Sequence, residues 1–219
     1  MNGTTSRAGA LPDRALAELY QLAGLGFLHP VPELHESLAD GVFQRAWDER
    51  LRVLGRPAAV LPPAGGDPAD HEAQYIALFH FGQAGTPVCP IHEGHYGHAH
   101  AGRGELLARL TQFYRHIGLQ SASEPGAREQ PDHLACELEV LAFLAFREST
   151  ASGAAAALAC RAAQADFLEH HLSRWIGDFA AQARQTGARL GCGAFLPALA
   201  TAVAGLVHWH AQTLQSGLR

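Results

Sequence analysis

Residues 131–146 read PDHLACELEVLAFLAF, and the spacing of their apolar side chains indicates the class of fold. When the residues are placed at 100° per residue from Asp132, one group of apolar side chains falls between about 180° and 280°. The members of this stripe are Leu134, Leu138, Leu141, Ala142 and Ala145. Such a stripe is typical of a helix that packs one face against a hydrophobic core.

The polar side chains of the same stretch fall on the other faces of the predicted helix. Pro131 suits the first helical position, because its missing N–H has no helical partner there. Asp132 and Glu139 lie together opposite the apolar stripe, so we expect neither to be a core residue. His133 and Glu137 are four residues apart, which predicts a surface or capping pair on the flank.

The rest of the chain follows the same helical period, and no convincing strand pattern occurs. The chain also has no internal repeat and no long linker. We therefore expect an all-α fold, with a disordered tail over residues 1–10 and a single globular multi-helix domain over residues 11–219. The predicted helices run from the N-cap Asp13 to His29, over about 42–54, 70–81 and 105–117, from Pro131 onward, over about 153–185 with an end at Gly187, and over about 197–215.

The charged residues exclude several classes of protein. All 16 basic residues are arginine, so a P-loop lysine, a Schiff-base lysine and a Ser–Lys dyad are absent. The formal net charge is −5 and the arginines are scattered. Nucleic-acid binding depends on clustered cations, so nucleic acid is not an expected partner.

Membrane and redox signals point to the cytoplasm. The longest nearly apolar stretch, residues 194–207, contains Pro197 and is shorter than the roughly 18–20 residues that span a bilayer. The first ten residues lack the apolar region of a signal peptide. The four cysteines, Cys89, Cys136, Cys160 and Cys192, form no CxxC motif. We expect reduced, mostly structural thiols and no membrane insertion.

Residues 82–104 form a glycine-rich loop with many histidines, and no regular element is expected there. The cluster His92, His95, His98 and His100, with Glu93, offers the ligand types that suit zinc, nickel or copper. The spacing matches no HExxH motif, and the frame is not a helix. A metal site and a set of solvated loop histidines are therefore both open.

Catalytic residues are not evident. His133 with Glu137 has the form of a base oriented by a carboxylate, but no nucleophile stands beside the pair. His170 and His171 lie in a long amphipathic helix and need no function, and Trp175 is expected in the core. We expect no enzymatic activity and no bound cofactor.

Three segments together resemble the TorD/DmsD/NarJ-type family of cytoplasmic chaperones that mature molybdenum enzymes. The resemblance covers roughly residues 15–212. The P-D-H-x-x-x-E-L run is its most specific part. The three segments are YIALF (75–79) followed by PIHEGHY (90–96), EQPDHLACELE (129–139), and FLEHHLSRWI (167–176).

The resemblance implies a TorD-like helical fold and a chaperone function. Such a chaperone binds the twin-arginine leader of an unfinished catalytic subunit, of the DMSO-reductase type, and delays its export until the molybdenum cofactor is inserted. A site for this leader needs carboxylates for the arginines and an apolar groove for the rest. The residues expected to bind leader or client are Tyr75, Leu78, Phe79, Pro90, Glu93, Tyr96, Asp132, His133, Glu137 and Glu139.

Two features depart from the family pattern, namely the histidines of residues 95–100 and glycine at position 94 where serine is common. The loop resembles the branch that serves dimethylsulfide, ethylbenzene or selenate-type enzymes. Two other functions remain open: a small metal-binding protein that uses loop 92–100, and a carrier of the molybdopterin guanine dinucleotide cofactor. The expected oligomeric state is a monomer or a domain-swapped dimer.

Overall fold

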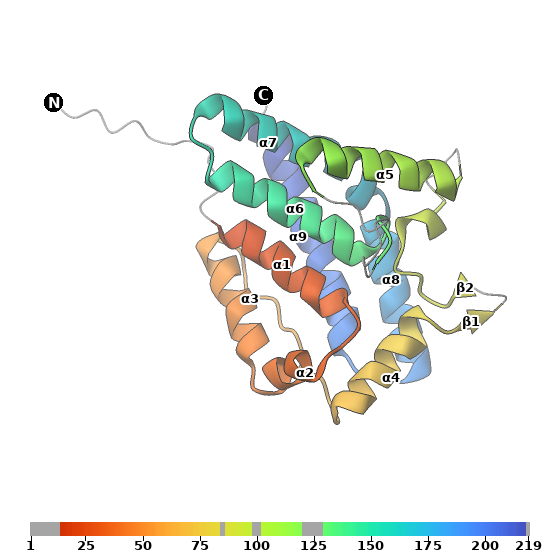
Figure 1. The fold of residues 1–219 in the computed structure, drawn as a ribbon. Coiled ribbons are helices and arrows are strands. Elements are labelled where there is room, and N and C mark those ends of the chain that lie inside the picture. The colour runs from red at the N-terminus through yellow and green to blue at the C-terminus, as the bar shows by residue number, and fades with distance from the viewer. Residues whose placement is uncertain (1–13, 84–85, 98–101, 120–128, 218–219) are drawn as a thin grey trace.

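The computed structural model describes residues 14–83, 86–97, 102–119 and 129–217, and these are mostly helical (Figure 1). The prediction of an all-α fold is confirmed. The helices are α1 Ala15–Phe27, α2 Pro32–Ala39, α3 Val42–Val53, α4 Pro68–Phe79, α5 Arg103–Ile117, α6 Leu134–Ser149, α7 Ala154–Phe167, α8 Ser173–Leu190 and α9 Phe195–Gly217. The expected cap Asp13 and the whole of the expected tail, residues 1–10, lie outside the described residues.

Short elements interrupt the glycine-rich loop, where no regular structure was predicted. Strand β1 (Gly82–Gln83) pairs antiparallel with β2 (Thr86–Pro87), and η1 (Glu93–His95) is a 3-10 turn. Two residues are too few for the alternation that reveals a strand in a sequence. This is why the prediction for this loop was wrong.

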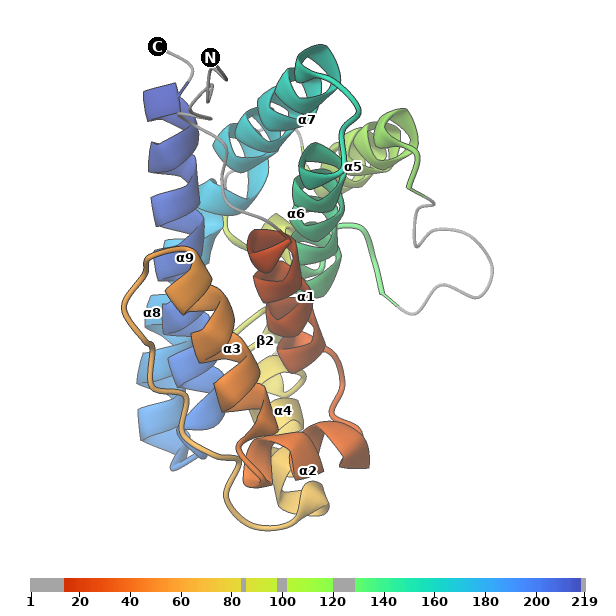
Figure 2. The ribbon, with the colours of Figure 1, turned by 90° about the vertical axis from the view of Figure 1, so that its left-hand side faces the viewer.

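Helix α6 lies at the centre of the fold. It packs along α1 and α7, and α1 lies between α6 and α3 (Figure 2). The stripe predicted for α6 is buried, as expected: Leu134, Leu138, Leu141, Ala142 and Ala145. Val140 and Leu144 on other faces are buried too, because α6 has neighbours on more than one side. Polar side chains near the start of α6 must therefore find partners inside the protein.

The start of α6 differs from the prediction. The helix begins at Leu134 rather than Pro131, and His133 is its N-cap. The ring Nδ1 of His133 accepts a hydrogen bond of 3.1 Å from the Ala135 N–H. This bond satisfies one of the backbone donors that a helix start leaves without a helical partner. Asp132 precedes the helix, so its predicted place on the helical wheel does not apply.

The long helix predicted over about 153–185, with its end at Gly187, is three consecutive elements. Helix α7 continues into the π-helix η2 (Leu168–Leu172) and then into α8, which ends before Gly191 at φ +65°. Gly187 lies inside α8 and not at its end. A Cβ there would come within 2.8 Å of Pro197 Cγ, so the glycine permits the close approach of α9.

Helix α2 was not predicted, because the His29-Pro30 pair indicated the end of helical structure. Pro32 stands at a helical N1 position and starts a new short helix directly after this break. Among the described residues, no helix has the length and apolar character needed to cross a membrane.

Candidate functional site

Two loops that are far apart in the sequence are joined through their backbones. The Glu93 N–H donates to Asp132 O at 2.9 Å, and the Leu134 N–H donates to Ile91 O at 3.0 Å. Between these bonds, His92 and His133 form an antiparallel bridge. Residues 89–96 and 130–134, called here the paired loops, therefore form one structural unit at the start of α6.

Asp132 is fully buried, so the expectation that it lies away from the core is wrong. Its two carboxylate oxygens accept hydrogen bonds from Arg103 Nε at 3.1 Å and Nη2 at 3.3 Å. The same Nη2 donates to Gln130 Oε1 at 2.6 Å. This two-point contact is directional, so it fixes the start of α5 against the paired loops.

Glu93 is also buried and joins the paired loops to η2. Its Oε2 lies 3.0 Å from Nδ1 of His171. A carboxylate only accepts hydrogen bonds, so Nδ1 of His171 carries the hydrogen. Glu93 was predicted to meet an arginine of a ligand, but its carboxylate already has this partner inside the protein.

Glu137 does not form the predicted flank pair with His133. It is fully buried, and its Oε2 accepts a hydrogen bond of 3.1 Å from Trp175 Nε1. Burial, followed by the negative charge of Glu93, raises the pKa of Glu137 well above its ordinary value. The uncharged form of the carboxyl group is therefore favoured.

The apolar residues expected to line a groove lie inside the protein. Tyr75, Leu78 and Phe79 are core residues with almost no exposed surface. The Tyr75 hydroxyl donates to Phe27 O. These side chains follow the helical period of α4, and such a stripe indicates core as readily as a ligand surface.

Pro90 and Tyr96 hold the loop that carries Glu93. Pro90 is buried, and the Tyr96 hydroxyl donates to Pro90 O at 2.7 Å. The half-buried Tyr96 ring packs beside Trp175, with ring centroids 5.2 Å apart. Both residues stabilise the conformation of the paired loops and do not line an open surface groove.

Glu139 is the exposed member of the predicted set, and it borders a groove between α1 and α6. The groove has a volume of about 410 Å³ and a mostly apolar lining. We call it the α1–α6 groove. It is lined by Tyr20, Gln21, Gly24, Leu25, Leu28, Ala135, Cys136 and Glu139.

A second carboxylate lies near this groove. Burial, and after it the negative charges of Glu139 and Glu129, raise the pKa of the Cys136 thiol to about 12. Both carboxylates are therefore close enough to Cys136 to act on it. The thiol is unreactive at neutral pH, and the negative charge beside the groove favours a cationic ligand.

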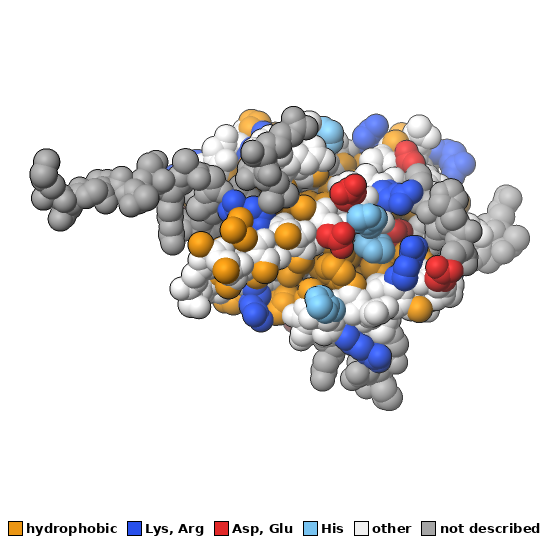
Figure 3. All heavy atoms as spheres, turned by 90° about the horizontal axis from the view of Figure 1, so that it is seen from above, with side chains coloured by type: hydrophobic (Ala, Val, Ile, Leu, Met, Phe, Trp, Pro, Cys, Tyr) orange, Lys and Arg blue, Asp and Glu red, His pale blue; other side chains and the backbone are white. Residues whose placement is uncertain are grey.

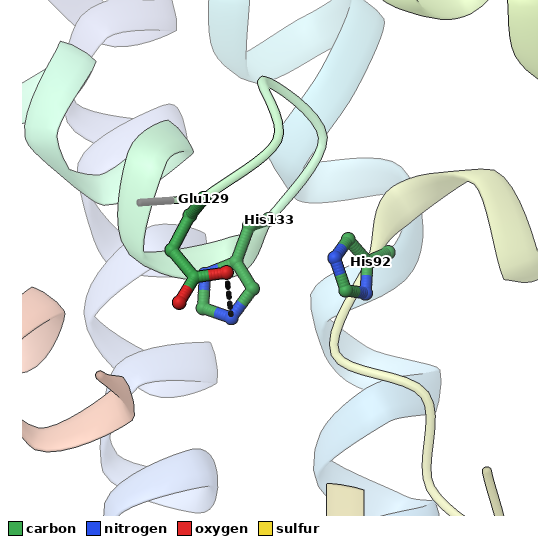
Figure 4. A group of neighbouring side chains, drawn as sticks. All are labelled: His92, Glu129 and His133. Carbon is green, nitrogen blue, oxygen red and sulfur yellow. Dashed lines mark ion pairs between the residues drawn. The ribbon is translucent and has the colours of Figure 1, made fainter. Parts of the chain in front are cut away.

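The structure brings together a group of possible metal ligands that differs from the predicted one. His92, Glu129 and His133 each place a ligand atom within 4.8 Å of the others (Figure 4). Of the predicted histidines, His95 is exposed and outside this group. His98 and His100 lie outside the described residues.

The hydrogen bonds of His133 do not suit a metal ligand. Burial, and then the charge of His92, lowers the pKa of His133 to about 3, so its ring is neutral at pH 7. Because Nδ1 accepts from the Ala135 N–H, the ring hydrogen is on Nε2. Nε2 lies 3.9 Å from Glu129 Oε2, and it would have to lose this hydrogen to bind a metal. The cluster therefore fits a contact in which Nε2 of His133 keeps its hydrogen beside Glu129 better than it fits a metal ion.

Three partners of the buried acids were missed by sequence reasoning, namely Arg103, His171 and Trp175. Arg103 carries no motif. His171 and Trp175 belong to the third segment of the family resemblance, and that pattern was the available signal. Spacing could not reveal them, because each partner comes from a distant part of the chain.

Comparison with known proteins gives relatives along most of the chain. The family model described as "Nitrate reductase delta subunit" matches residues 42–181. The chain is 38% identical over 178 residues to the dimethyl sulfide dehydrogenase assembly chaperone protein of Rhodovulum sulfidophilum, which covers 78% of this chain and 70% of that protein.

Two further relatives are named in the same way. The selenate reductase assembly chaperone protein of Thauera selenatis is 38% identical over 110 residues, covering 49% of this chain and 54% of that protein. The perchlorate reductase assembly chaperone protein of Dechloromonas aromatica is 28% identical over 175 residues, covering 75% and 76%. No solved structure matches the chain.

Proposed function

Because the chain belongs to the nitrate reductase delta subunit family, we propose that it is an assembly chaperone for the catalytic subunit of a molybdenum-containing oxidoreductase. The observation that carries this proposal is the 38% identity to a protein named as an assembly chaperone, over 78% of this chain. The predicted resemblance to the TorD/DmsD/NarJ-type family is confirmed. The names of the relatives support a role in maturation and not in catalysis.

The client of this chaperone is an enzyme of the DMSO-reductase type. The relatives are named for dimethyl sulfide dehydrogenase, selenate reductase and perchlorate reductase, which supports a client of related chemistry. The chaperone acts in the cytoplasm, where it holds the client back from export until its cofactor is in place. The carrier function, the metal-binding function and the oligomeric state stay predictions.

The twin-arginine leader of the client binds in the α1–α6 groove. Its apolar segment lies against Gly24 and Leu25 near the end of α1 and against Leu28, the C-cap of this helix. Its arginine pair meets Glu139 and Glu129, because guanidinium and carboxylate groups form directional two-point hydrogen bonds. Leu25 is 53% exposed, so its apolar surface is available to a ligand.

The buried acids act as positioning residues in this proposal. Asp132, Glu93 and Glu137 each have a partner inside the protein, so they are not free to bind a leader arginine. They hold the paired loops and thereby the first turns of α6. Because Cys136 and Glu139 are in these turns, the geometry of the groove depends on these acids.

A capture experiment tests the proposed function. The tagged full chain is expressed in its native host, and the proteins that bind it are isolated from a cytoplasmic extract and identified. The account predicts the catalytic subunit of a molybdenum enzyme that still carries its leader. A host strain in which this subunit lacks its leader is the control, and capture should fall strongly there. If the mature, cofactor-loaded subunit is captured equally well, the proposal is wrong.

A further inference from the structure

A second hollow lies on another face of the molecule, between α5 and the consecutive elements α7, η2 and α8. It has a volume of about 750 Å³, and we call it the basic cleft. Figure 3 shows histidine, arginine and acidic side chains gathered on the face that is uppermost in Figure 1. The cleft is lined by Glu93, Arg109, Gln112, Phe113, Arg115, His116, Asp166, His170, His171 and Arg174.

Two facing rows of side chains form this cleft. Arg109, Phe113 and His116 are spaced by four and three residues, so they lie on one face of α5. Asp166 and Arg174 are eight residues apart on the opposite wall. The element between these two is η2, and short π-helical turns often occur at functional sites.

The acids of the cleft are already paired, whereas its arginines are not. Glu93 contacts His171 at 3.0 Å, and Asp166 Oδ1 lies 3.2 Å from His170 Nδ1. Within the described ranges, the side chains of Arg109, Arg115 and Arg174 form no ion pair and no hydrogen bond. The cleft therefore has three positive groups without an acidic partner, namely Arg109, Arg115 and Arg174. They stand together although the chain as a whole has a net charge of −5.

From this arrangement we infer that the basic cleft binds the phosphoryl group of a small molecule. Guanidinium groups match phosphate oxygens with two parallel hydrogen bonds, and arginines on both walls can approach one anion from two sides. The volume lies in the usual range of about 300–1,000 Å³ for small-molecule sites. Phe113 is half-buried in the α5 wall and offers an apolar surface to the organic part of the ligand.

This site is separate from the proposed leader groove. The groove lies between α1 and α6, whereas the basic cleft lies between α5 and η2. Its test therefore does not depend on the client. The purified full chain is titrated calorimetrically at low salt with inorganic phosphate, pyrophosphate and a nucleoside diphosphate. The last two ligands show whether the cleft recognises the phosphoryl groups alone or also the attached organic part.

The decisive variant is Arg109→Gln/Arg174→Gln, which removes one arginine from each wall. We expect it to raise the Kd for pyrophosphate at least about tenfold, which corresponds to about 1.4 kcal/mol. The matched control is Arg52→Gln/Arg189→Gln, which removes the same charge from exposed positions outside the cleft. The control should keep the Kd of the unmodified chain.

Two results would overturn the inference. One is an equal loss of affinity in both double variants, since this would show a general charge effect. The other is the absence of pyrophosphate binding by the unmodified chain at millimolar concentration. Thermal melting without ligand verifies that both variants are folded, because the substituted arginines are exposed. If the nucleoside diphosphate binds more tightly than pyrophosphate, its organic part also contacts the cleft. If the two ligands bind equally well, the cleft recognises the phosphoryl groups alone. Both results support the site.

Discussion

Three buried carboxyl groups hold the paired loops, and each has a different kind of partner. Asp132 pairs with the guanidinium of Arg103, Glu93 with an imidazole, and Glu137 with the indole N–H of Trp175. Buried polar groups are costly unless they are hydrogen-bonded. The stability of this region therefore depends on single residues more than its apolar core would indicate.

Asp132→Asn should destabilise the protein. The amide keeps the shape of the side chain but loses the charge that Arg103 contacts at two points. Arg103 is 40% exposed, so solvent reduces the effect, and we expect a loss of ~1–3 kcal/mol in the free energy of unfolding. Urea unfolding measures this loss. Glu139→Gln, at an exposed position, is the control and should leave stability unchanged. If Asp132→Asn leaves the free energy of unfolding unchanged, the assigned contact with Arg103 is wrong.

The stability of Glu137→Gln, measured relative to that of the unmodified chain, should increase as the pH rises. The folded protein keeps Glu137 protonated above its ordinary pKa, whereas the unfolded chain releases the proton. The unmodified protein therefore loses up to ~1.4 kcal/mol per pH unit from this group as the pH increases above about 4.5. Glutamine does not titrate. The free energies of unfolding of the two proteins should differ more at pH 8 than at pH 5 in favour of the variant. The same difference at both pH values would show that Glu137 is charged in the folded protein.

At the scale of secondary structure, the start of α6 depends on a neutral histidine. His133 accepts from the Ala135 N–H with its ring nitrogen, and this requires an unprotonated Nδ1. Backbone bonds to residues 91–93 hold the same segment from the other side. The cap, the paired loops and the groove wall are therefore consecutive parts of one segment.

His133→Asn and His133→Ala separate the capping role from the titration. Asparagine is also a good N-cap, so His133→Asn should keep stability at pH 7.5, whereas His133→Ala should lose ~1 kcal/mol. Below pH 6.5 the unfolded histidine takes up a proton, but the folded one does not until about pH 3. The unmodified chain thus loses stability as the pH falls through this window.

Both variants should therefore lose less stability than the unmodified chain between pH 7.5 and pH 5. Unfolding curves at these two values measure the effect. The other buried histidines, such as His210 with a pKa lowered to about 3 by burial, are present in all three proteins and cancel in the comparison. An acid sensitivity that is the same in all three proteins would contradict a neutral His133 in the folded state.

At the scale of the whole molecule, local periodicity predicted the fold well and the site poorly. The apolar stripe of α6 depends only on residues close in sequence, and its burial is as predicted. The partners of the buried acids are 29, 38 and 78 residues away. No local pattern carries such distant contacts. The position of Asp132 also depended on the helix start, and a shift of three residues changed its environment from surface to interior.

The two proposed binding surfaces use different elements and opposite charges. The α1–α6 groove combines apolar side chains with Glu139, and the basic cleft combines three arginines with two acids that are paired with histidines. The paired loops contact both regions, through α6 on one side and through the Glu93–His171 pair on the other. They form a physical connection between the two surfaces.

The central claim is that a leader peptide binds in the α1–α6 groove, and calorimetric titration with the twin-arginine leader of the captured client tests it most directly. Glu139→Gln removes a proposed arginine partner, and Leu25→Asp places a charge in the apolar part of the groove. The matched control is Glu36→Gln on α2, which is exposed and outside the groove.

The account predicts that Glu139→Gln weakens leader binding by ~1–3 kcal/mol, the range for hydrogen bonds to charged groups. Leu25→Asp should weaken it at least as much, and Glu36→Gln should leave it unchanged. All three substitutions are at exposed positions, so unchanged melting temperatures verify the fold. If the folded Glu139→Gln and Leu25→Asp variants bind the leader as tightly as the unmodified chain, the leader does not bind in this groove.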